Sequence, residues 1–218
     1  MNQAELNIIL AAHTEWLATG GFRGVRADLS GADLREVSFR GVNLHSANLS
    51  DANLRGVDLS NANLSRTHLL CADLSGATVS DANLLRADLS GANLTRSNLT
   101  GANLLRSNLS DANLSDANLS IVELNGANLS GASLWGCIGN RKNIKSIHVS
   151  EDYEIVYTSE YLQIGCERHL ISEWAEFDGN DIFGMDGNRG LDFWRIWKDY
   201  IFMTIEKSPA VPTGYKEK

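Results

Sequence analysis

The chain has 218 residues, 43% of them hydrophobic, and a formal net charge of −8 with an isoelectric point near 5.1. This length accommodates one or two domains, and the hydrophobic content is ordinary for a globular protein. The acidic balance argues against direct nucleic-acid binding, because affinity for phosphate requires clustered Lys and Arg.

The cysteine content and the N-terminal sequence predict a cytoplasmic protein. Cys71, Cys137 and Cys166 form an odd, widely spaced set, which gives no disulfide framework and indicates a reducing compartment. Glu5 and Glu15 interrupt the apolar N-terminal stretch, and no basic leader precedes it. We therefore predict neither a signal peptide nor a membrane-spanning segment.

The first element is a helix predicted over residues 3–17. Apolar side chains recur there at near-helical spacing, and the glycine pair Gly20-Gly21 is expected to end the helix before Phe22 enters the next element. The apolar positions are Leu6, Ile9, Leu10 and Trp16.

A five-residue repeat begins near Ala27 and continues to Gly136. An apolar residue, almost always Leu, stands at every fifth position from Leu29 to Leu134, which makes twenty-two units without a skip. Two residues before each centre is a small side chain, usually Ala, and the residue between them is usually Asn or Asp. Ser, Gly, Asp or Arg mostly fill the two positions that follow, so the unit reads A(N/D)LSG.

A period of five fits neither the 3.6-residue period of a helix nor the simple alternation of an isolated strand. The small and large apolar residues lie two apart, however, and in an extended segment this spacing places both on one face. A short extended piece followed by a turn would bury both and expose the other three residues. Four such sides would close a coil of twenty residues around an apolar axis.

The repeat resembles that of the pentapeptide repeat family over half of the chain. The resemblance implies an all-β fold, a right-handed quadrilateral β-helix, whose five and a half coils would make a rod of about 26 Å at the usual strand spacing. The open ends of such a rod need caps. We therefore assign residues 1–21 to an N-terminal helical cap, 22–136 to the β-helix and 137–218 to a small C-terminal α+β domain.

The C-terminal domain is predicted to begin with strands over 143–149, 153–158 and 161–166, the first two joined by a turn at Glu151-Asp152. A helix near 170–177, a Gly/Asp/Asn-rich loop and an amphipathic helix over 191–207 follow. Trp174, Phe193, Trp194 and Trp197 are expected to form its core. The sequence from Gln163 to Phe177 resembles a module of phage and bacterial proteins for which no activity is known.

No motif in the sequence indicates catalysis, a cofactor or a metal site, and we predict a protein that is not an enzyme. His169 lies three residues after Cys166 and close to Glu167 and Glu173, but no second Cys/His cluster completes a metal site. The repeat aspartates interchange with Asn at equivalent positions, as Asp88 does with Asn93. This interchange favours short polar side chains that satisfy turn backbone over paired carboxylates or calcium ligands.

Residues twenty apart should stack on one face, and one column of the repeat is unusual. Arg66, Arg86 and Arg106 follow one another in it, and Leu85 and Leu105 stand where the repeat normally has Ser. Outward Leu side chains beside a guanidinium ladder are typical of a binding patch. The alternative is that the Leu and Arg stems only pack on one another.

The sequence predicts a module that binds a protein partner and leaves two alternative functions for it. The quinolone-resistance proteins of the pentapeptide repeat family resemble a B-DNA rod and engage DNA gyrase in place of DNA. The repeat here holds eleven acidic residues against seven arginines, a net charge of −4. The resemblance thus implies an inhibitor of a DNA-handling enzyme, such as a topoisomerase, a nuclease or a defence complex. The acidic positions proposed for such mimicry are Asp51, Asp81, Asp111 and Asp116.

The alternative is a scaffold or regulatory protein that uses the column of Arg66, Leu85, Arg86, Leu105 and Arg106 and does not mimic DNA. Both functions require a protein partner, and neither requires a membrane or a cofactor. Family members are often dimers through a terminal helix, which makes a homodimer through the C-terminal domain a further expectation.

Overall fold

The computed structural model describes residues 1–139, 143–147, 153 and 155–213. The chain divides into two compact units, one spanning Met1–Ile138 and including Thr213, the other spanning Gly139–Pro212. The division falls two residues after the predicted boundary at residue 136.

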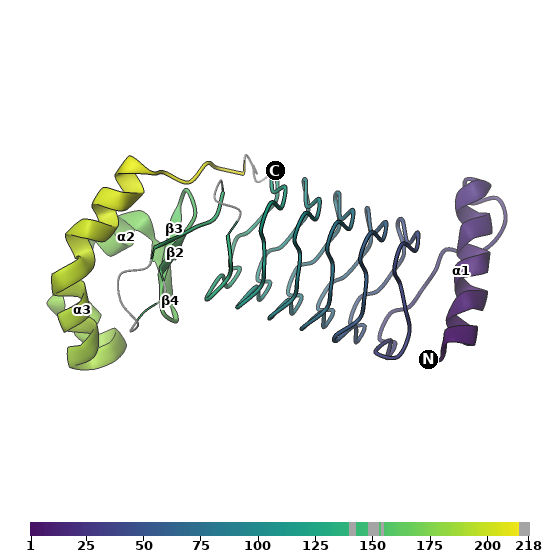
Figure 1. Ribbon diagram of the computed structural model, residues 1–218, viewed down its shortest axis with the longest axis horizontal. Coiled ribbons are helices and arrows are strands. Elements are labelled where there is room, and N and C mark those ends of the chain that lie inside the picture. Colours follow the sequence, from purple (N-terminus) through teal and green to yellow (C-terminus); the bar gives the residue numbers. More distant parts are fainter. Residues whose placement is uncertain (140–142, 148–152, 154, 214–218) are drawn as a thin grey trace. The chain divides into compact units, whose positions relative to one another are not determined.

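The first unit begins with α1, Gln3–Ala18, which lies across one end of a stack of coils (Figure 1). Asn2 starts the helix because its side chain accepts a hydrogen bond from the backbone N–H of Glu5, whose carboxylate accepts one from the backbone of Asn2 in return. The predicted helix is confirmed to within one residue at its C-terminal end.

The repeat forms the coils by pairing with itself every twenty residues. Parallel bridges join each bridging residue to the one twenty positions on, from Asp28 with Asn48 to Asn118 with Ile138. The bridging residue is the one that precedes each apolar centre, and four five-residue units therefore complete one coil. The repeat is a β-helix, as predicted; its right-handed sense stays a prediction.

The apolar centres fill the axis of the coils. Every centre from Leu29 to Leu124 is at most 1% exposed, and most of the Ala residues two positions earlier are equally buried. The sequence predicted that Phe22 enters the first coil. This prediction was wrong, because Phe22 is 94% exposed. The buried core of the coils instead begins at Ala27, after a loop whose residue Val25 donates a backbone hydrogen bond to Ala12 of α1.

Each corner of the coil is a tight turn. In the first one the N–H of Ala32 donates to the carbonyl oxygen of Leu29, three residues earlier, at 3.2 Å. The second residue after the centre has a φ of 52° to 73° in every unit from Gly31 to Gly136 except that of Glu36. A positive φ at the third position of such a turn is the type II geometry, which favours Gly or Asn. Arg, Asp, Cys and Ile nevertheless occupy many of these corners.

The Asp and Asn residues that precede the centres satisfy turn backbone, as predicted. Asp88, for example, accepts hydrogen bonds from the backbone N–H and the hydroxyl of Ser90 at 3.2 and 2.7 Å. It also accepts one from the amide of Asn108 in the next coil at 3.1 Å. These bonds account for the Asp and Asn residues of the repeat as structural groups.

α1 docks on the first coil through a buried histidine that the sequence did not single out. The His13 side chain is fully buried, and its Nδ1 accepts a hydrogen bond from the backbone N–H of Ala27 at 3.1 Å. Its ring stacks on Trp16 with 5.6 Å between centroids. Burial, then the nearby His45 and Arg26, lower the pKa of His13. The neutral form of the imidazole is therefore favoured at the junction of cap and coil.

The second unit is a four-stranded antiparallel sheet in the order β1-β2-β3-β4 with two helices. The elements are β1 (Lys145–Ile147), β2 (Ile155–Tyr157), β3 (Tyr161–Ile164), β4 (Glu167–Leu170), α2 (Ile171–Glu176) and α3 (Gly179–Lys207). Each of the three predicted strand segments contains a strand, namely β1, β2 and β3. The predicted turn at Glu151-Asp152 lies outside the described residues.

The predicted helix near 170–177 is confirmed as α2. The segment 167–170, for which no strand was predicted, is a strand, β4, paired with β3 in a register that places His169 opposite Leu162. One prediction for this unit was wrong. The Gly/Asp/Asn-rich segment is not a loop, because α3 already begins at Gly179. Asp178 caps that helix by accepting hydrogen bonds from the N–H groups of Asn180 and Asp181. The glycines produce only a kink, at Asp186 and Gly187.

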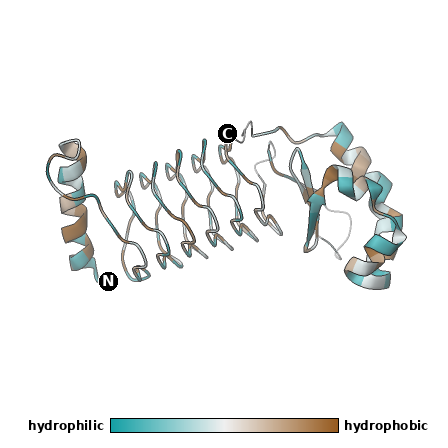
Figure 2. Cartoon of the chain, turned by 180° about the vertical axis from the view of Figure 1, so that it is seen from behind, coloured by the Kyte–Doolittle hydropathy of each residue, from teal (hydrophilic) through white to brown (hydrophobic). Residues whose placement is uncertain are grey.

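The predicted aromatic core of the second unit is largely confirmed. Trp174, Phe193 and Trp194 are at most 6% exposed, and Trp197 packs against them while partly buried. The indole N–H of Trp174 donates to the carbonyl oxygen of Leu162 at 2.7 Å, which ties α2 to the sheet. α3 carries both hydrophobic and hydrophilic residues along its length, as an amphipathic helix does (Figure 2).

Among the described residues, none of the helices combines the length and the apolar character needed to cross a membrane.

Leu94→Ala should lower the free energy of unfolding of the β-helix by about 3 kcal/mol, because it leaves a cavity in a close-packed axis. Leu94 is 1% exposed, whereas Leu70 is 44% exposed and provides a matched control. Leu70→Ala should change stability by less than about 0.5 kcal/mol. Urea titrations followed by circular dichroism measure both, and equal losses would contradict the assignment of the axis.

His13 should make docking of α1 dependent on pH. Its pKa is lowered in the folded protein, so its contribution to stability is complete above the ordinary value of 6.5 and is lost as the pH falls below that value. The melting temperature should therefore fall more steeply below about pH 6.5 in the parent protein than in His13→Gln. Parallel slopes for the two proteins would show that His13 does not titrate in this way.

Candidate functional site

The structure brings the predicted Arg and Leu column together as one open groove of about 670 Å³ on the first unit. We call it the Arg-Leu groove. Its lining residues are Arg66, Leu85, Arg86, Leu105, Arg106, Asn125 and Gly126. The first five are the residues that the sequence predicted.

Backbone hydrogen bonds set the spacing of the groove. The N–H of Arg66 donates to the carbonyl of Leu85, and that of Arg86 to the carbonyl of Leu105, both at 2.9 Å. The N–H of Arg106 likewise donates to the carbonyl of Asn125, at 3.0 Å. Arg66, Arg86 and Arg106 thus form a row, which we call the arginine ladder. Successive guanidinium side chains therefore start about 4.8 Å apart, the distance between neighbouring strands.

Sequence reasoning missed Asn125 and Gly126, which form the end of the groove. The signal was present, because they lie twenty residues after Leu105 and Arg106. A Cβ built on Gly126 would lie 3.0 Å from Cγ of Arg106, which shows that the alkyl stem of Arg106 rests on that glycine. The absence of a side chain at Gly126 thus makes room for the last arginine of the ladder.

Arg66, Arg86 and Arg106 differ in their charge environment from three of the other four arginines of the repeat. Arg35, Arg55 and Arg96 each have a carboxylate oxygen 2.7 to 3.8 Å from a guanidinium nitrogen. No ion pair joins Arg66, Arg86 or Arg106 to any carboxylate in the part of the chain that the structure describes. These guanidinium groups are exposed and are not neutralised by the described part of the chain itself.

The apolar part of the groove is confined to two coils. Leu85 and Leu105 are half-buried and occupy the first outward position after their centres. One coil earlier the same position is Ser65, whose hydroxyl lies 2.7 Å from Nδ1 of His45 in the coil before that. Beside Arg66 the outward position therefore holds a serine with a polar contact in place of a leucine. The groove is polar at this end.

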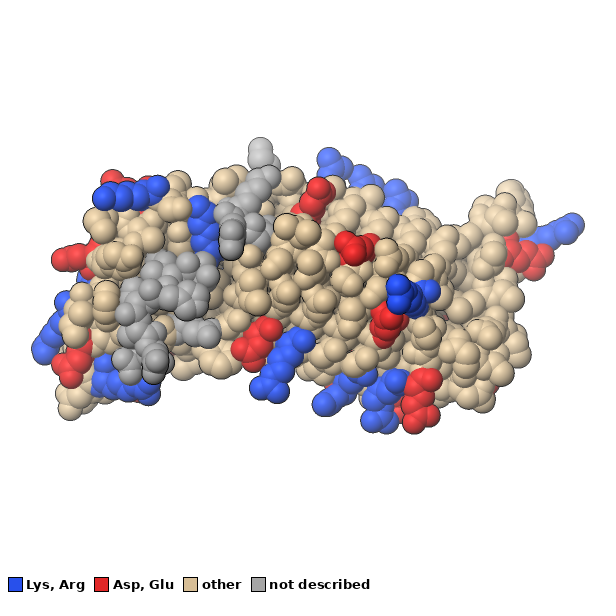
Figure 3. All heavy atoms as spheres, in the orientation of Figure 1, with Lys and Arg blue, Asp and Glu red and all other residues tan. Residues whose placement is uncertain are grey.

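The acidic residues proposed for DNA mimicry are spread over three corners of the coil. Asp51 and Asp111 share one corner but lie three coils apart, and Asp81 lies on another. Asp116 lies on a third corner, where its carboxylate is 3.5 Å from Nε of Arg96. Over the coils, positive and negative side chains are interspersed with much uncharged surface on the face shown in Figure 3. The structure thus gathers the Arg and Leu set and disperses the Asp set.

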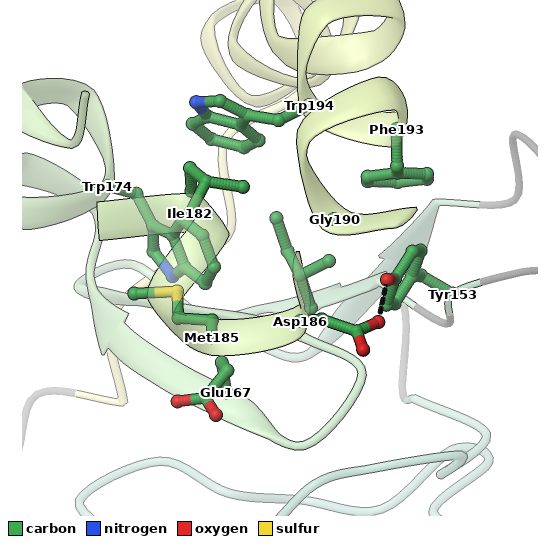
Figure 4. Close-up of a pocket in the computed structure, with 10 residues that line it drawn as sticks. Tyr153, Glu167, Trp174, Ile182, Met185, Asp186, Gly190, Phe193 and Trp194 are labelled. Atoms are coloured by element: carbon green, nitrogen blue, oxygen red, sulfur yellow. Dashed lines mark hydrogen bonds between the residues drawn. The ribbon is translucent and has the colours of Figure 1, made fainter. Parts of the chain in front are cut away.

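The second unit contains a small apolar pocket next to the kink in α3 (Figure 4). Trp174, Trp194 and Phe193 line it, and the hydroxyl of Tyr153 donates a hydrogen bond to Asp186 at its edge. His169 on β4 lies 3.6 Å from a carboxylate oxygen of Glu167, and its ring packs edge-on against Trp174. The described residues contain no group of three or more His, Cys, Asp or Glu side chains placed to hold a metal ion.

Comparison with known proteins identifies the repeat. Segments within residues 25–121 match the family described as "Pentapeptide repeats" in eight copies, over 25–61, 47–84, 58–96 and 87–121. Over this region the chain belongs to the pentapeptide repeat family. The match ends before the C-terminal domain, whose similarity to a phage and bacterial module stays a prediction. No curated protein matches the chain.

Three solved structures illustrate the similarity. Rfr23 from the cyanobacterium Cyanothece 51142 is 41% identical over 45% of this chain and 60% of its own, with a TM-score of 0.29. HetL, involved in heterocyst differentiation regulation in Nostoc sp. strain PCC 7120, is 33% identical over 53% and 63%, with a TM-score of 0.33. QnrB1, a plasmid-mediated fluoroquinolone resistance protein, is 26% identical over 50% and 58%, with a TM-score of 0.31. The chain covers less than two thirds of each of these proteins.

Arg86→Gly tests whether the ladder stabilises the fold. Arg86 has a φ of 58°, a conformation that costs an L-residue about 1–2 kcal/mol and that Gly adopts freely. Gly loses more entropy on folding, so we expect a net gain in unfolding free energy of up to about 1 kcal/mol. Urea denaturation measures the difference.

Arg96→Gly is the matched control, since Arg96 has the same φ of 58° but pairs with Asp116. The variant gains the same backbone relief and loses an exposed ion pair worth up to about 1 kcal/mol. A loss of more than about 1 kcal/mol in Arg86→Gly would instead show that the Arg and Leu stems stabilise the coil by packing on one another.

Proposed function

We propose that this protein is a non-catalytic binding module whose β-helix holds a protein partner through the Arg-Leu groove. The observation that carries the proposal is the groove itself, in which two outward leucines lie beside three arginines without a carboxylate partner in the described chain. Half-buried Leu beside Arg is the composition of protein interfaces, where Arg is enriched and the centre is apolar.

The overall charge favours a protein partner over nucleic acid. The chain carries −8 and its repeat carries −4, so the protein as a whole would repel a phosphate backbone. The leucines at the centre of the groove offer nothing to a phosphate. A protein surface can satisfy both the guanidinium groups and the leucines.

DNA mimicry is the second candidate, and the acidic excess of the repeat favours it. In this function the module inhibits a DNA-handling enzyme, such as gyrase or another topoisomerase, a nuclease or a defence complex, through Asp51, Asp81, Asp111 and Asp116. Placement of these residues on three corners weakens the candidate, because complementarity to one basic surface requires a continuous acidic face.

The proposal extends to location and assembly. A cytoplasmic location is supported by the odd, widely spaced set of three cysteines, which gives no disulfide framework. Homodimerisation through the C-terminal domain is supported by an apolar stripe on α3. Ile196, Tyr200 and Met203 recur there at helical spacing and are 68%, 45% and 41% exposed. Finally, the β-helix has the right-handed quadrilateral form that membership of the family implies.

The testing experiment is a pull-down from bacterial lysate with the purified full chain as bait and mass spectrometry as the readout. The double variant Leu85→Asp, Leu105→Asp should lose the partner, because carboxylates replace the apolar centre of the groove. Leu70→Asp is the matched control, since Leu70 occupies the same position of its five-residue unit but lies on another corner. It should retain the partner.

Short duplex DNA is then added to the captured complex. A partner that stays bound under DNA and is lost only in the double variant supports the groove. A topoisomerase or nuclease that DNA releases, and that the double variant still captures, would establish DNA mimicry and contradict the proposal.

A further inference from the structure

We propose that the occupant of the Arg-Leu groove is an acidic amphipathic helix of the partner protein, lying along the stacking direction of the coils. This inference rests on the proposed function and specifies the chemistry of the partner. Carboxylates at positions i, i+3 and i+7 of that helix would meet Arg66, Arg86 and Arg106, and apolar residues beside them would cover Leu85 and Leu105.

The positive charge of the groove favours an anionic partner. Three guanidinium groups project from successive coils and repel one another, and no ion pair to a carboxylate relieves that repulsion in the described part of the chain. For Arg35, Arg55 and Arg96 the fold supplies such a carboxylate, as Asp116 does for Arg96 at 3.5 Å. The ladder is therefore complementary to a row of anionic groups from outside.

The three arginines adopt a backbone conformation that is unfavourable for their residue type. All three ladder arginines have a φ of 57° or 58°, at a corner position that is Gly in many other units. Arg is unfavourable in this conformation, and three successive coils nevertheless carry it. An arrangement that costs conformational energy and adds charge repulsion is consistent with a role in binding.

Spacing decides between an extended segment and a helix. The ladder repeats about every 4.8 Å, so its third member lies about 9.6 Å from the first. Same-face residues of an extended segment recur about every 6.7 Å and reach about 13.4 Å at the third member. In a helix, residues i+3 and i+7 lie about 4.5 and 10.5 Å from residue i along the axis. These distances differ by less than about 1 Å from the ~4.8 and ~9.6 Å that separate the second and third arginines from the first.

The leucines indicate carboxylates on a protein rather than phosphates. Leu85 and Leu105 lie one residue before Arg86 and Arg106, so the apolar strip runs parallel to the ladder. A helix with acidic residues in one row and apolar residues in the next presents the complementary pair of strips. A nucleic-acid strand would leave the leucines uncovered.

The probe is a fluorescein-labelled, Ala-rich helical peptide with Glu at i, i+3 and i+7 and Leu at i+4 and i+8, titrated with the full chain by fluorescence anisotropy. A peptide of the same composition with its Glu residues spread around the helix is the control. The patterned peptide should bind at least about tenfold more tightly, and the difference should shrink with added salt.

The variant of choice is the triple change Arg66→Gly, Arg86→Gly, Arg106→Gly, because Gly is compatible with the backbone at this corner. It should weaken binding of the patterned peptide by about tenfold or more. Arg96→Gly, on another corner, should leave the affinity within about twofold. The triple Asn variant serves if the Gly variant shows altered circular dichroism, since Asn also tolerates a positive φ.

Equal affinity for the two peptides, or unchanged affinity in the triple variant, would overturn the helix assignment. Tighter binding of a single-stranded oligonucleotide than of the patterned peptide would show that the ladder recognises phosphate. If the peptide does not bind while the Leu85→Asp, Leu105→Asp variant still loses its partner from lysate, the helix inference fails and the proposed function stands. If that double variant also keeps its partner, both fail.

Discussion

The backbone ladder between coils is the interaction on which the rest of the structure depends. The N–H of Leu49 donates to the carbonyl of His68 at 2.7 Å, the N–H of Asn48 donates to Ala27 at 3.0 Å, and the same pattern recurs along the repeat. Because these bonds pair residues that are twenty positions apart in the sequence, each side chain is placed over its counterpart in the next coil. Inward positions then form the apolar axis, and outward positions form columns whose spacing is fixed by the backbone.

This constraint separates stability from function within one unit of five residues. Most of the centres and of the small residues two positions before them are buried, so that substitutions there affect the fold. The two turn residues contribute backbone geometry, and their side chains are free to vary outward. Arg66, Arg86 and Arg106 illustrate the cost of that freedom, because they hold a conformation better suited to Gly. Residues stacked at one corner can therefore form a binding surface without any change in the buried axis.

The two units of the chain stabilise themselves in different ways. The β-helix repeats one small contact many times, which is typical of solenoids. The second unit relies on one aromatic core, in which Trp174 both packs on Trp194 at 5.1 Å between centroids and donates a hydrogen bond to Leu162. The groove lies on the first unit alone, and the exposed stripe of α3 gives the second unit a separate surface for assembly.

The sequence by itself determined the repeat, its buried positions and the membership of the Arg-Leu column, because a strict period of five gives every residue a fixed place relative to the axis. It also predicted the aromatic core of the second unit. Only the tertiary structure decided where the coils begin, since Phe22 is as apolar as a core residue yet lies outside on a loop. Local composition likewise misjudged α3, because the cap at Asp178 and packing on the sheet outweigh the low helix propensity of its glycines. Tertiary structure alone also showed that, among the described residues, no carboxylate pairs with Arg66, Arg86 or Arg106, and that the aspartates lie on three corners. Ion pairing depends on which side chains meet across coils.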